Sequence, residues 1–337
     1  MTQATSRHRG RRRSTILIYA ALLGTGLAFA ALLLATGSMK FGFIEIARAL
    51  VGFEENHRLL RVVVDIRLPR VLTAALVGAS LGVAGAIFQS VARNPLGSPD
   101  ILGFSTGAAT GAILQIIVLG AGAAQIVLSA VAAGLITAFF VYGASRRRGS
   151  AEGPRLVLVG IGAGAFLSGF NTLLLVAGDL DRAMAAQVWL SGSLMARSWA
   201  HVGMAATSLA LALPLVLIFL RPLRLIEMGD DLARQLGVKV EATRLTMMLA
   251  GVVLTASATA AAGPIAFLAL IAPHLARRIL GVSQFHIVPA GLFGATLLLG
   301  ADLACQTAAR TINVPIGLAT GMIGGIYLLF FIRSRQL

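Results

Sequence analysis

The sequence is poor in charged residues, in cysteine and in lysine, and each shortage excludes a class of protein. Only 12% of the 337 residues are charged, whereas 57% are hydrophobic, and the mean hydropathy is +0.87. No soluble domain of this length has such a composition, so the sequence predicts a membrane protein that crosses the bilayer several times. Cys305 is the only cysteine, so no disulfide can form within the chain.

The shortage of lysine also excludes a Walker-type ATP-binding loop. That loop needs a Gly-Lys pair followed by serine or threonine, whereas the two lysines, Lys40 and Lys239, precede phenylalanine and valine. The histidines are scattered, with no second ligand at metal-binding spacing. No serine, cysteine or carboxylate arrangement suggests a hydrolase in the membrane. We therefore expect a chain that is not an enzyme and that holds no metal or cofactor itself.

Apolar runs of bilayer length predict an all-α fold with about ten membrane-spanning helices. Approximately, the runs cover residues 16–36, 70–91, 99–119, 123–144, 155–178, 199–220, 244–262, 265–280, 285–306 and 314–332. A signal peptide is the alternative for the first run, but its apolar core would have only about 7–15 residues. We expect one transmembrane domain over residues 1–337, with a basic tail at residues 1–14 and a mixed surface segment at residues 37–70.

Basic residues divide unevenly between the two sides of these spans. With the N-terminus inside, most Lys and Arg fall on inner segments, and the outer segments are nearly uncharged apart from the first. That first outer segment holds Lys40, Arg48, Arg58, Arg61, Arg67 and Arg70. The positive-inside rule therefore places both termini in the cytoplasm. The net charge of +15 does not indicate nucleic-acid binding, because the basic residues lie between apolar spans.

The most charged internal segment, residues 221–244, falls on the cytoplasmic side in this topology. Asp230–Asp231 can cap and favour the start of a short helix, and Gly237 is a typical C-terminal cap. Leu232 and Leu236 lie four residues apart and share one face. Such an amphipathic helix on a membrane protein is a docking surface for a soluble partner, and an ordinary polar connector is the alternative.

Other polar features interrupt the apolar pattern. Arg67 and Arg70 flank a proline on the outer side and form a basic site for an acidic partner, unless they snorkel at the membrane interface. Asp302 lies within the ninth span, where we expect it to bind a neighbouring helix rather than to carry ions.

An inner turn between the second and third spans is broken by prolines. A simple connector is one interpretation of this turn, but the polar residues Asn94, Ser98 and Asp100 could cap helix ends there. The gating candidates are Gln89, Asn94, Pro95, Ser98 and Pro99.

Together these motifs resemble those of the iron-chelate and vitamin B12 importer permeases of the ABC transporter family. The matching strings are Arg67-Leu-Pro-Arg70, Arg93-Asn-Pro-Leu-Gly-Ser-Pro-Asp100, Met228–Gly237, Gly263–Phe267, Ala272–Arg277 and Pro315-Ile-Gly317. Within the family, the strings Ser90–Asp100, Glu227–Asp231 and Gly324–Tyr327 resemble those of ferric-enterobactin permeases.

The resemblance implies a type II ABC importer permease in the bacterial cytoplasmic membrane. It implies a second, related but distinct permease subunit, two ATP-binding subunits that bind ATP and Mg, and an extracytoplasmic siderophore-binding protein. The helix in an ATPase groove would use Glu227, Met228, Gly229, Asp230, Asp231, Ala233, Arg234, Leu236 and Gly237.

The resemblance also implies that Arg67 and Arg70 meet acidic residues of the binding protein. Many relatives carry a third arginine late in the ninth span, where this chain has Gln306. Either the third basic contact is missing here, or Arg310, one turn further on, is the third docking residue. The implied function is ATP-driven import of a ferric siderophore, a catecholate such as enterobactin. A haem or cobalamin permease is the alternative within the family. An ATP-independent carrier is the alternative outside it, and the lack of buried ionisable residues in the spans argues against ion coupling.

Overall fold

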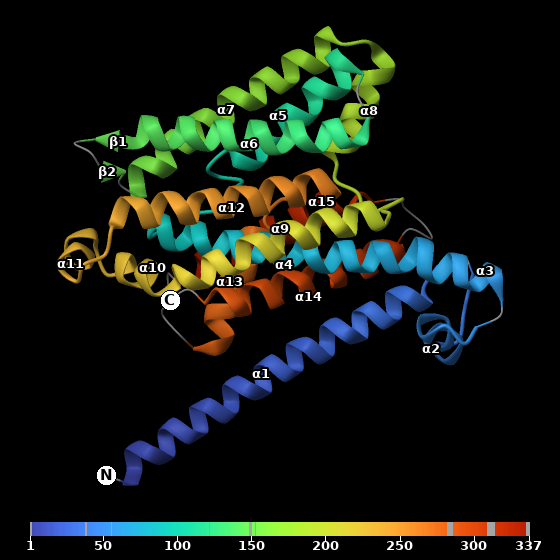
Figure 1. The fold of residues 1–337 in the computed structure, drawn as a ribbon, viewed down its shortest axis with the longest axis horizontal. Coiled ribbons are helices and arrows are strands. Elements are labelled where there is room, and N and C mark those ends of the chain that lie inside the picture. The colour runs from blue at the N-terminus through green and yellow to red at the C-terminus, as the bar shows by residue number, and fades with distance from the viewer. Residues whose placement is uncertain are drawn as a thin grey trace.

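A computed structural model describes residues 2–37, 39–54, 56–120, 122–147, 150–151, 153–281, 286–308 and 314–334. The described chain is an elongated bundle of helices (Figure 1). In its first half the elements are α1 (Thr2–Ala35), α2 (Phe43–Val51), α3 (His57–Leu60), η1 (Arg61–Arg67), α4 (Leu68–Ala92), α5 (Phe104–Leu114), η2 (Gln115–Leu119), α6 (Ala123–Ser145), β1 (Arg146–Arg147), β2 (Ser150–Ala151) and α7 (Gly153–Ala177). In its second half they are α8 (Leu180–Leu190), α9 (Trp199–Ile218), α10 (Leu220–Glu227), α11 (Asp230–Gln235), α12 (Val240–Ala262), α13 (Leu268–Leu280), α14 (Ile287–Ala308) and α15 (Ile316–Ser334). The predicted helical fold is confirmed, with one two-residue antiparallel pairing of β1 and β2 between α6 and α7.

Seven helices of the described chain are long and apolar enough to cross a membrane. They cover residues 16–35, 57–92, 124–145, 153–177, 199–218, 240–262 and 287–308. The apolar helices over residues 104–119 and 316–330 are shorter, and α13 has 13 residues. These three coincide with the remaining expected spans, so the chain is a multi-pass membrane protein in which some spans are short. A short helix inside a bundle is tolerated because neighbouring protein shields its ends.

The second span begins earlier than the sequence predicted. Within the expected surface segment, α3, η1 and α4 form one continuous helix from His57 to Ala92. Leu59 and Val63 are buried on its inner side, while Arg58 and Arg61 are exposed on the outer side. Arg58 and Arg61 therefore lie on the exposed face of a helix whose other face is buried in the bundle. A second unexpected helix is α8, which lies in the segment expected to be an outer loop.

Helix α4 lies at the centre of the bundle, and most of its residues are buried. A Cβ atom at Gly82 would overlap the carbonyl oxygen of Ala290 in α14, and one at Gly85 would overlap that of Ala269 in α13. The backbones of these helices therefore touch directly. Glycine permits this close approach, which supplies the packing that holds membrane helices together.

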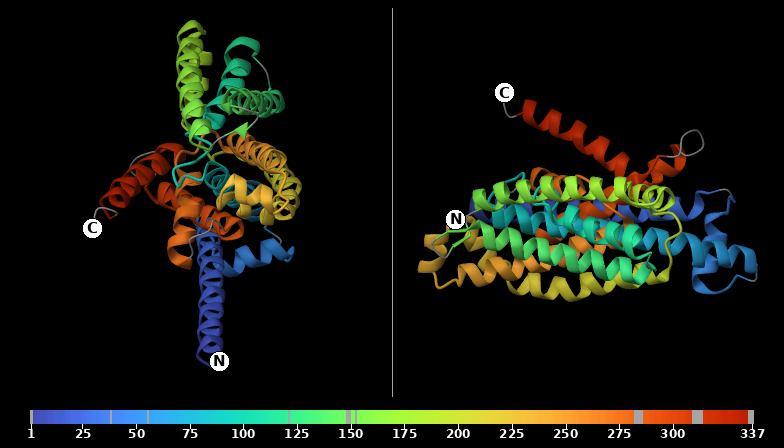
Figure 2. Two further views of the ribbon diagram at one scale, coloured as in Figure 1. Left: turned by 90° about the vertical axis from the view of Figure 1, so that its left-hand side faces the viewer. Right: turned by 90° about the horizontal axis from the view of Figure 1, so that it is seen from above.

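The two ends of the bundle carry different structures. Helices α10 and α11 and the strands β1 and β2 lie at one end, and α2 and α3 lie at the other (Figures 1 and 2). Helix α1 crosses the outside of the bundle and packs mainly on α14, while α15 leans away from the bundle toward the C-terminus (Figure 2). The candidate coupling and docking residues therefore lie at opposite ends of the molecule.

Candidate functional site

The local backbone of α11 depends on the glycine at each end. Gly229 precedes the helix with φ of 125°, and Gly237 follows it with φ of 81°, a region that favours glycine. The amide of Val238 donates to the carbonyl of Ala233 at 2.9 Å, so the predicted C-terminal cap at Gly237 is confirmed. The Asp230 side chain does not cap the helix as predicted, because it binds arginine side chains instead.

Helix α11 has one buried face and one exposed apolar face. Ala233 is buried together with Ile226 of α10 and Val240 of α12, which fixes α11 against its neighbours. Leu232 and Leu236 are exposed together, as their spacing predicted, and Met228 beside them is also exposed. Large apolar side chains gathered at the polar end of a membrane protein indicate a surface that another protein covers.

Asp230 connects α11 to the membrane spans. Both of its carboxylate oxygens accept hydrogen bonds from Arg244 Nη2 of α12, at 2.9 and 3.0 Å, and Arg93 at the end of α4 lies 3.6 Å away. The Arg244 side chain is only 1% exposed, and its Nη1 donates to Glu241 at 3.0 Å. Because a buried guanidinium needs its carboxylate partners, Asp230 holds a fixed position.

The neighbouring carboxylate has a different environment. The Asp231 side chain is 94% exposed and accepts a hydrogen bond from Arg234 within the same helix, at 3.0 Å. At the end of α10, Glu227 accepts a 2.6 Å hydrogen bond from Ser90 of α4. The residues predicted to couple to an ATPase therefore form two groups. Glu227 and Asp230 bond to the spans, whereas Met228, Asp231 and Leu236 are exposed.

The turn between α4 and α5 is held by its own polar side chains. The Asn94 Oδ1 atom accepts from the amide of Leu96 at 2.9 Å, and Ser98 Oγ accepts from the amide of Ile101 at 3.3 Å. Pro95 is partly exposed and Pro99 is buried. Both bonds lie within the turn, and Gly103 at the start of α5 has no side-chain cap, so Asn94 and Ser98 do not cap helix ends as predicted but hold the turn itself.

Two residues of the same region contact the start of α13. Gln89 is buried and donates from Nε2 to the carbonyl of Leu270 at 3.1 Å. The Asp100 Oδ2 atom accepts from the amide of Phe267 at 3.3 Å, while Oδ1 accepts from Ser105 at 2.6 Å. Phe267 has a left-handed φ of 64° at the N-cap of α13. The turn after α4 is therefore bonded to the start of α13.

At the end of the bundle opposite α11, Arg67 stabilises the connection between α1 and α2. Its side chain donates to the carbonyls of Leu34 and Met39, each at 2.6 Å, and its guanidinium lies 5.1 Å from the centroid of the Phe41 ring. The residue is 8% exposed. Arg67 therefore ties the connection between α1 and α2 to the second span, and contact with a partner protein would require it to leave these two carbonyls.

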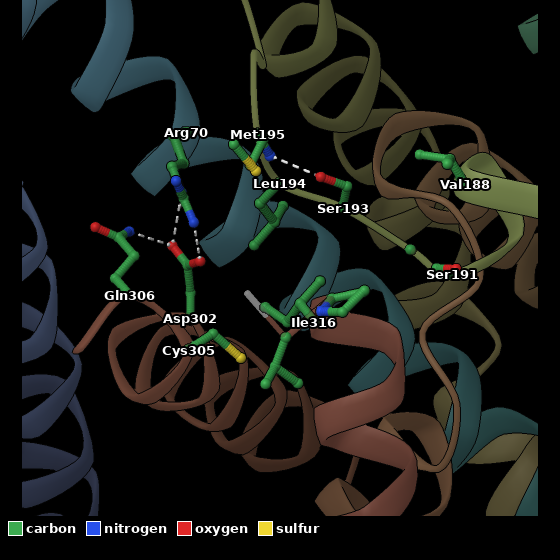
Figure 3. A pocket seen from close by; sticks show the side chains of 13 residues that line it. Arg70, Val188, Ser191, Ser193, Leu194, Met195, Asp302, Cys305, Gln306 and Ile316 are labelled. Carbon is green, nitrogen blue, oxygen red and sulfur yellow. Dashed lines mark hydrogen bonds and ion pairs between the residues drawn. The ribbon is translucent and has the colours of Figure 1, made fainter. Parts of the chain in front are cut away.

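Arg70 lies on the wall of a cavity and is paired with Asp302 (Figure 3). Its Nη2 and Nε atoms donate to the two carboxylate oxygens at 2.6 and 3.0 Å, and Gln306 Nε2 donates to the same carboxylate at 3.0 Å. The expectation that Asp302 binds a neighbouring span is confirmed. The cavity, of about 350 Å³, is also lined by residues 191–195 and by Ile316 at the start of α15. Arg310 lies outside the described residues.

Among the residues that the structure describes, no three His, Cys, Asp or Glu side chains are grouped to hold a metal ion. The candidate functional features are instead a helix with an exposed apolar face at one end and a cavity beside an ion pair at the other. They are joined by helices long and apolar enough to cross a membrane, so the class is that of a multi-pass membrane protein.

The family of the chain follows from comparison with known proteins. Residues 21–334 match the FecCD transport family, so the chain belongs to that family. It is 45% identical over 303 residues to the ferric enterobactin transport system permease protein FepG of Escherichia coli strain K12, covering 90% of this chain and 91% of that protein. It is 35% identical over 306 residues to the achromobactin transport system permease protein CbrC of Dickeya dadantii strain 3937, with 90% and 87% covered.

A solved structure has the same fold. It is an inward-facing conformation of a metal-chelate type ABC transporter, to which this chain is similar with a TM-score of 0.82 and 27% sequence identity. The match covers 95% of this chain and 99% of the other. The fold expected for an ABC importer permease is therefore confirmed.

Proposed function

We propose that this chain is the permease subunit of an ABC importer that takes up a ferric siderophore of the catecholate class. The observation that carries the proposal is the exposed apolar face of α11, bonded to the spans through Asp230 and Glu227. The sequence offers no Walker loop, so the ATP, with its Mg, is bound by two separate ATPase subunits and the chain itself is not an enzyme. The 45% identity to a permease named for ferric enterobactin supports the catecholate cargo.

The coupling end would lie in the cytoplasm, together with both termini, as the distribution of basic residues supports. Met228, Leu232 and Leu236 would then enter a groove on the ATPase subunit, while Ala233 keeps α11 attached to its own chain. When ATP binding closes the two ATPase subunits, α11 is displaced. The displacement passes to α4 through two contacts: Glu227 accepts a hydrogen bond from Ser90, and Asp230 lies beside Arg93.

The gate would be the region around the turn after α4. Asn94, Pro95, Ser98 and Pro99 give this turn a fixed shape, so it moves as a unit with the end of α4. Gln89 and Asp100 connect that unit to the start of α13. A movement of α11 would thereby change the relative positions of α4 and α13, and the path would open alternately to the two sides of the membrane.

The permease would work as one of a pair of related but distinct chains. Exposed apolar side chains cover the outer faces of α7 and α15, and these faces fit a second permease subunit and the lipid. On α7 they include Leu158, Ile161, Phe166, Leu173 and Val176, and on α15 they include Leu318, Met322, Ile323, Ile326 and Leu329. A siderophore-binding protein would dock at the other end, where the side chain of Arg70 is 24% exposed.

Uptake in cells tests the proposal directly. A panel of radiolabelled iron chelates, with haem and cobalamin, is supplied to cells with and without this chain. Ferric catecholate uptake should depend on the chain and should stop when the ATPase subunit is inactivated. Uptake of haem or cobalamin alone would move the chain to that branch of the family. Accumulation driven by an ion gradient in vesicles that contain only this chain would contradict the proposal.

A further inference from the structure

One corner of the bundle, at the α11 end, is formed by segments that carry basic residues and no acidic ones. The segments are the N-terminal part of α1, the end of α13 and the start of α14, and the N-terminus of α1 lies at the same end as α10 and α11 (Figures 1 and 2). The sequence has no Asp or Glu before Glu45 and none between Glu241 and Asp302. None of the three segments therefore supplies a carboxylate, and positive charge accumulates there.

Contacts between α1 and α14 set the level of these charges. The Leu22 carbonyl accepts a hydrogen bond from the Thr296 hydroxyl at 3.4 Å, and further along Phe29 lies against Gly300, so the two helices run in the same direction. Nine residues before the Leu22–Thr296 bond, about 14 Å back along an α-helix, α14 begins and α1 has reached Arg13. The basic segment of α1 therefore lies level with the start of α14.

Basic residues from four elements lie at this corner, which we call the cationic corner: Arg13 of α1, Arg224 of α10, Arg278 of α13 and His286 just before α14. Arg278 is exposed and His286 is half-buried. Burial, and then the charge of the nearby Arg224, lower the pKa of His286. The Nε atom of Arg224 is buried and, among the described residues, has no hydrogen-bond partner. No ion pair within the described chain involves Arg224 or Arg278.

The acidic side chains of the neighbouring helices are already bonded elsewhere. Each carboxylate of α10, α11 and α12 accepts a hydrogen bond from another side chain of the protein. These carboxylates are Glu227, Asp230, Asp231 and Glu241. A group that neutralises the cationic corner therefore comes from outside the chain.

Exposed aliphatic side chains lie beside the charges. Ile16 and Leu17 follow the basic segment of α1 and are 60% and 68% exposed, and Ile279 and Val288 are exposed next to Arg278 and at the start of α14. Only 6% of the apolar window of α1 is buried in the bundle. The helices that enter the membrane at this corner thus present hydrocarbon directly beside a positively charged rim. An anionic phospholipid has the complementary order of groups, with a phosphate at the surface and acyl chains below it.

We propose that the cationic corner binds the headgroups of anionic phospholipids, such as phosphatidylglycerol, in the leaflet at the α11 end. Arginine binds phosphate through two parallel hydrogen bonds, and the acyl chains lie along Ile16, Leu17 and Val288. A soluble acidic protein would neutralise the charges, but it would not cover aliphatic side chains at the depth of the bilayer. The inference goes beyond the proposed function and does not depend on the cargo.

The test counts the lipids that stay bound to the assembled transporter, by native mass spectrometry after release from nanodiscs of equal parts phosphatidylcholine and phosphatidylglycerol. Arg13→Gln/Arg278→Gln removes two charges from the cationic corner. The matched control, Arg146→Gln/Lys239→Gln, removes two exposed charges at the same end from β1 and from the start of α12. The parent should retain phosphatidylglycerol at least about fivefold over phosphatidylcholine. The corner variant should lower this preference at least about threefold, and the control by less than about 1.5-fold.

A conservative variant separates charge from the shape of the side chain. Arg13→Lys/Arg278→Lys keeps both charges and should retain most of the phosphatidylglycerol, and added salt should weaken retention by the parent. Thermal unfolding of each purified complex checks that the variants are folded. A loss in the lysine variant as large as that in the glutamine variant would overturn the electrostatic basis of the inference.

The remaining outcomes also decide the matter. Equal retention of the two lipids by the parent, or an unchanged preference in the corner variant, would overturn the inference. Equal losses in the corner variant and the control would assign the preference to net charge and overturn it as well. If the corner variant keeps its lipid but loses the ATPase subunit, the corner belongs to a protein interface. None of these results decides which chelate is imported, so the proposed function stands or falls separately in the uptake assay.

Discussion

Asp302 of α14 accepts two hydrogen bonds from the guanidinium of Arg70 in α4, across a separation of 232 residues in the sequence. The same two helices touch through their backbones at Gly82 and Ala290. The Arg70–Asp302 pair near the start of α4 and the contact of Gly82 with Ala290 further along it therefore fix α4 against α14. Helix α4 also carries Ser90, which donates to Glu227, and is followed by Arg93, which lies 3.6 Å from Asp230, so the proposed coupling segment contacts this same helix.

The ion pair should stabilise the fold only while both partners are present. Asp302→Ala leaves Arg70 beside a cavity without its carboxylate and should cost about 2–4 kcal/mol. The double variant Arg70→Met/Asp302→Leu should recover much of that loss because no unpaired charge remains. Thermal unfolding of the purified complex measures both, with Asp65→Ala, at an exposed carboxylate, as the control. A single variant as stable as the parent would argue against a structural role for the pair.

The glycine contact should be intolerant of a methyl group. Gly82→Ala would drive Cβ into the carbonyl of Ala290 and should cost about 1–3 kcal/mol as the helices move apart. Gly169→Ala in α7 is the matched control, because nothing lies within 4 Å of its added Cβ. That control should be neutral or stabilising by up to about 1 kcal/mol, since alanine favours helix more than glycine. Midpoints of thermal unfolding that fall equally for both variants would refute the contact.

The exposed leucines of α11 should affect assembly rather than folding. Leu232→Ser/Leu236→Ser removes apolar surface that is open in this chain, so unfolding should change little, while less ATPase subunit should co-purify. Leu119→Ser makes the same kind of change at an exposed leucine far from α11 and should leave co-purification unchanged. Full co-purification with the double variant would remove the apolar face from the coupling proposal.

The two acids of α11 should differ when each is neutralised. Asp230→Asn weakens the partner of the buried Arg244 and should lower both stability and transport-coupled ATPase activity. Asp231→Asn disrupts only an exposed pair with Arg234, worth about 0–1 kcal/mol, and should leave stability nearly unchanged. Reversing both charges to lysine should reduce the coupled ATPase activity further. Equal effects of the two asparagine variants on thermal unfolding would contradict this division.

The sequence predicted features that depend on neighbouring residues more successfully than features that depend on distant ones. Apolar runs located the spans, and Gly237 located the end of α11, because length and backbone freedom act locally. The helical extension at Arg58 and Arg61 was missed because these charged residues were assigned to a mixed surface segment and not to the second span. The role of Arg67 depends on the carbonyls of Leu34 and Met39, 33 and 28 residues away, which no local pattern indicates.

The bond between Asp100 and the start of α13 should matter for coupling between ATP hydrolysis and transport. Asp100→Ala removes the acceptor for the Phe267 amide and for Ser105, so the turn after α4 is no longer tied to α13. Chelate uptake should then fall by more than the ATPase activity, because the proposed contact of α11 with the ATPase is intact while the proposed gate no longer follows α11.

Two further variants make this prediction specific. Asp100→Asn keeps one carbonyl acceptor and should be milder, and Ser105→Ala removes one donor while leaving the Phe267 bond in place. Parallel assays of uptake and ATP hydrolysis in proteoliposomes give the ratio for each variant. A parallel fall of uptake and hydrolysis in Asp100→Ala would indicate general damage to the transporter, since a gate that has lost its connection still permits hydrolysis.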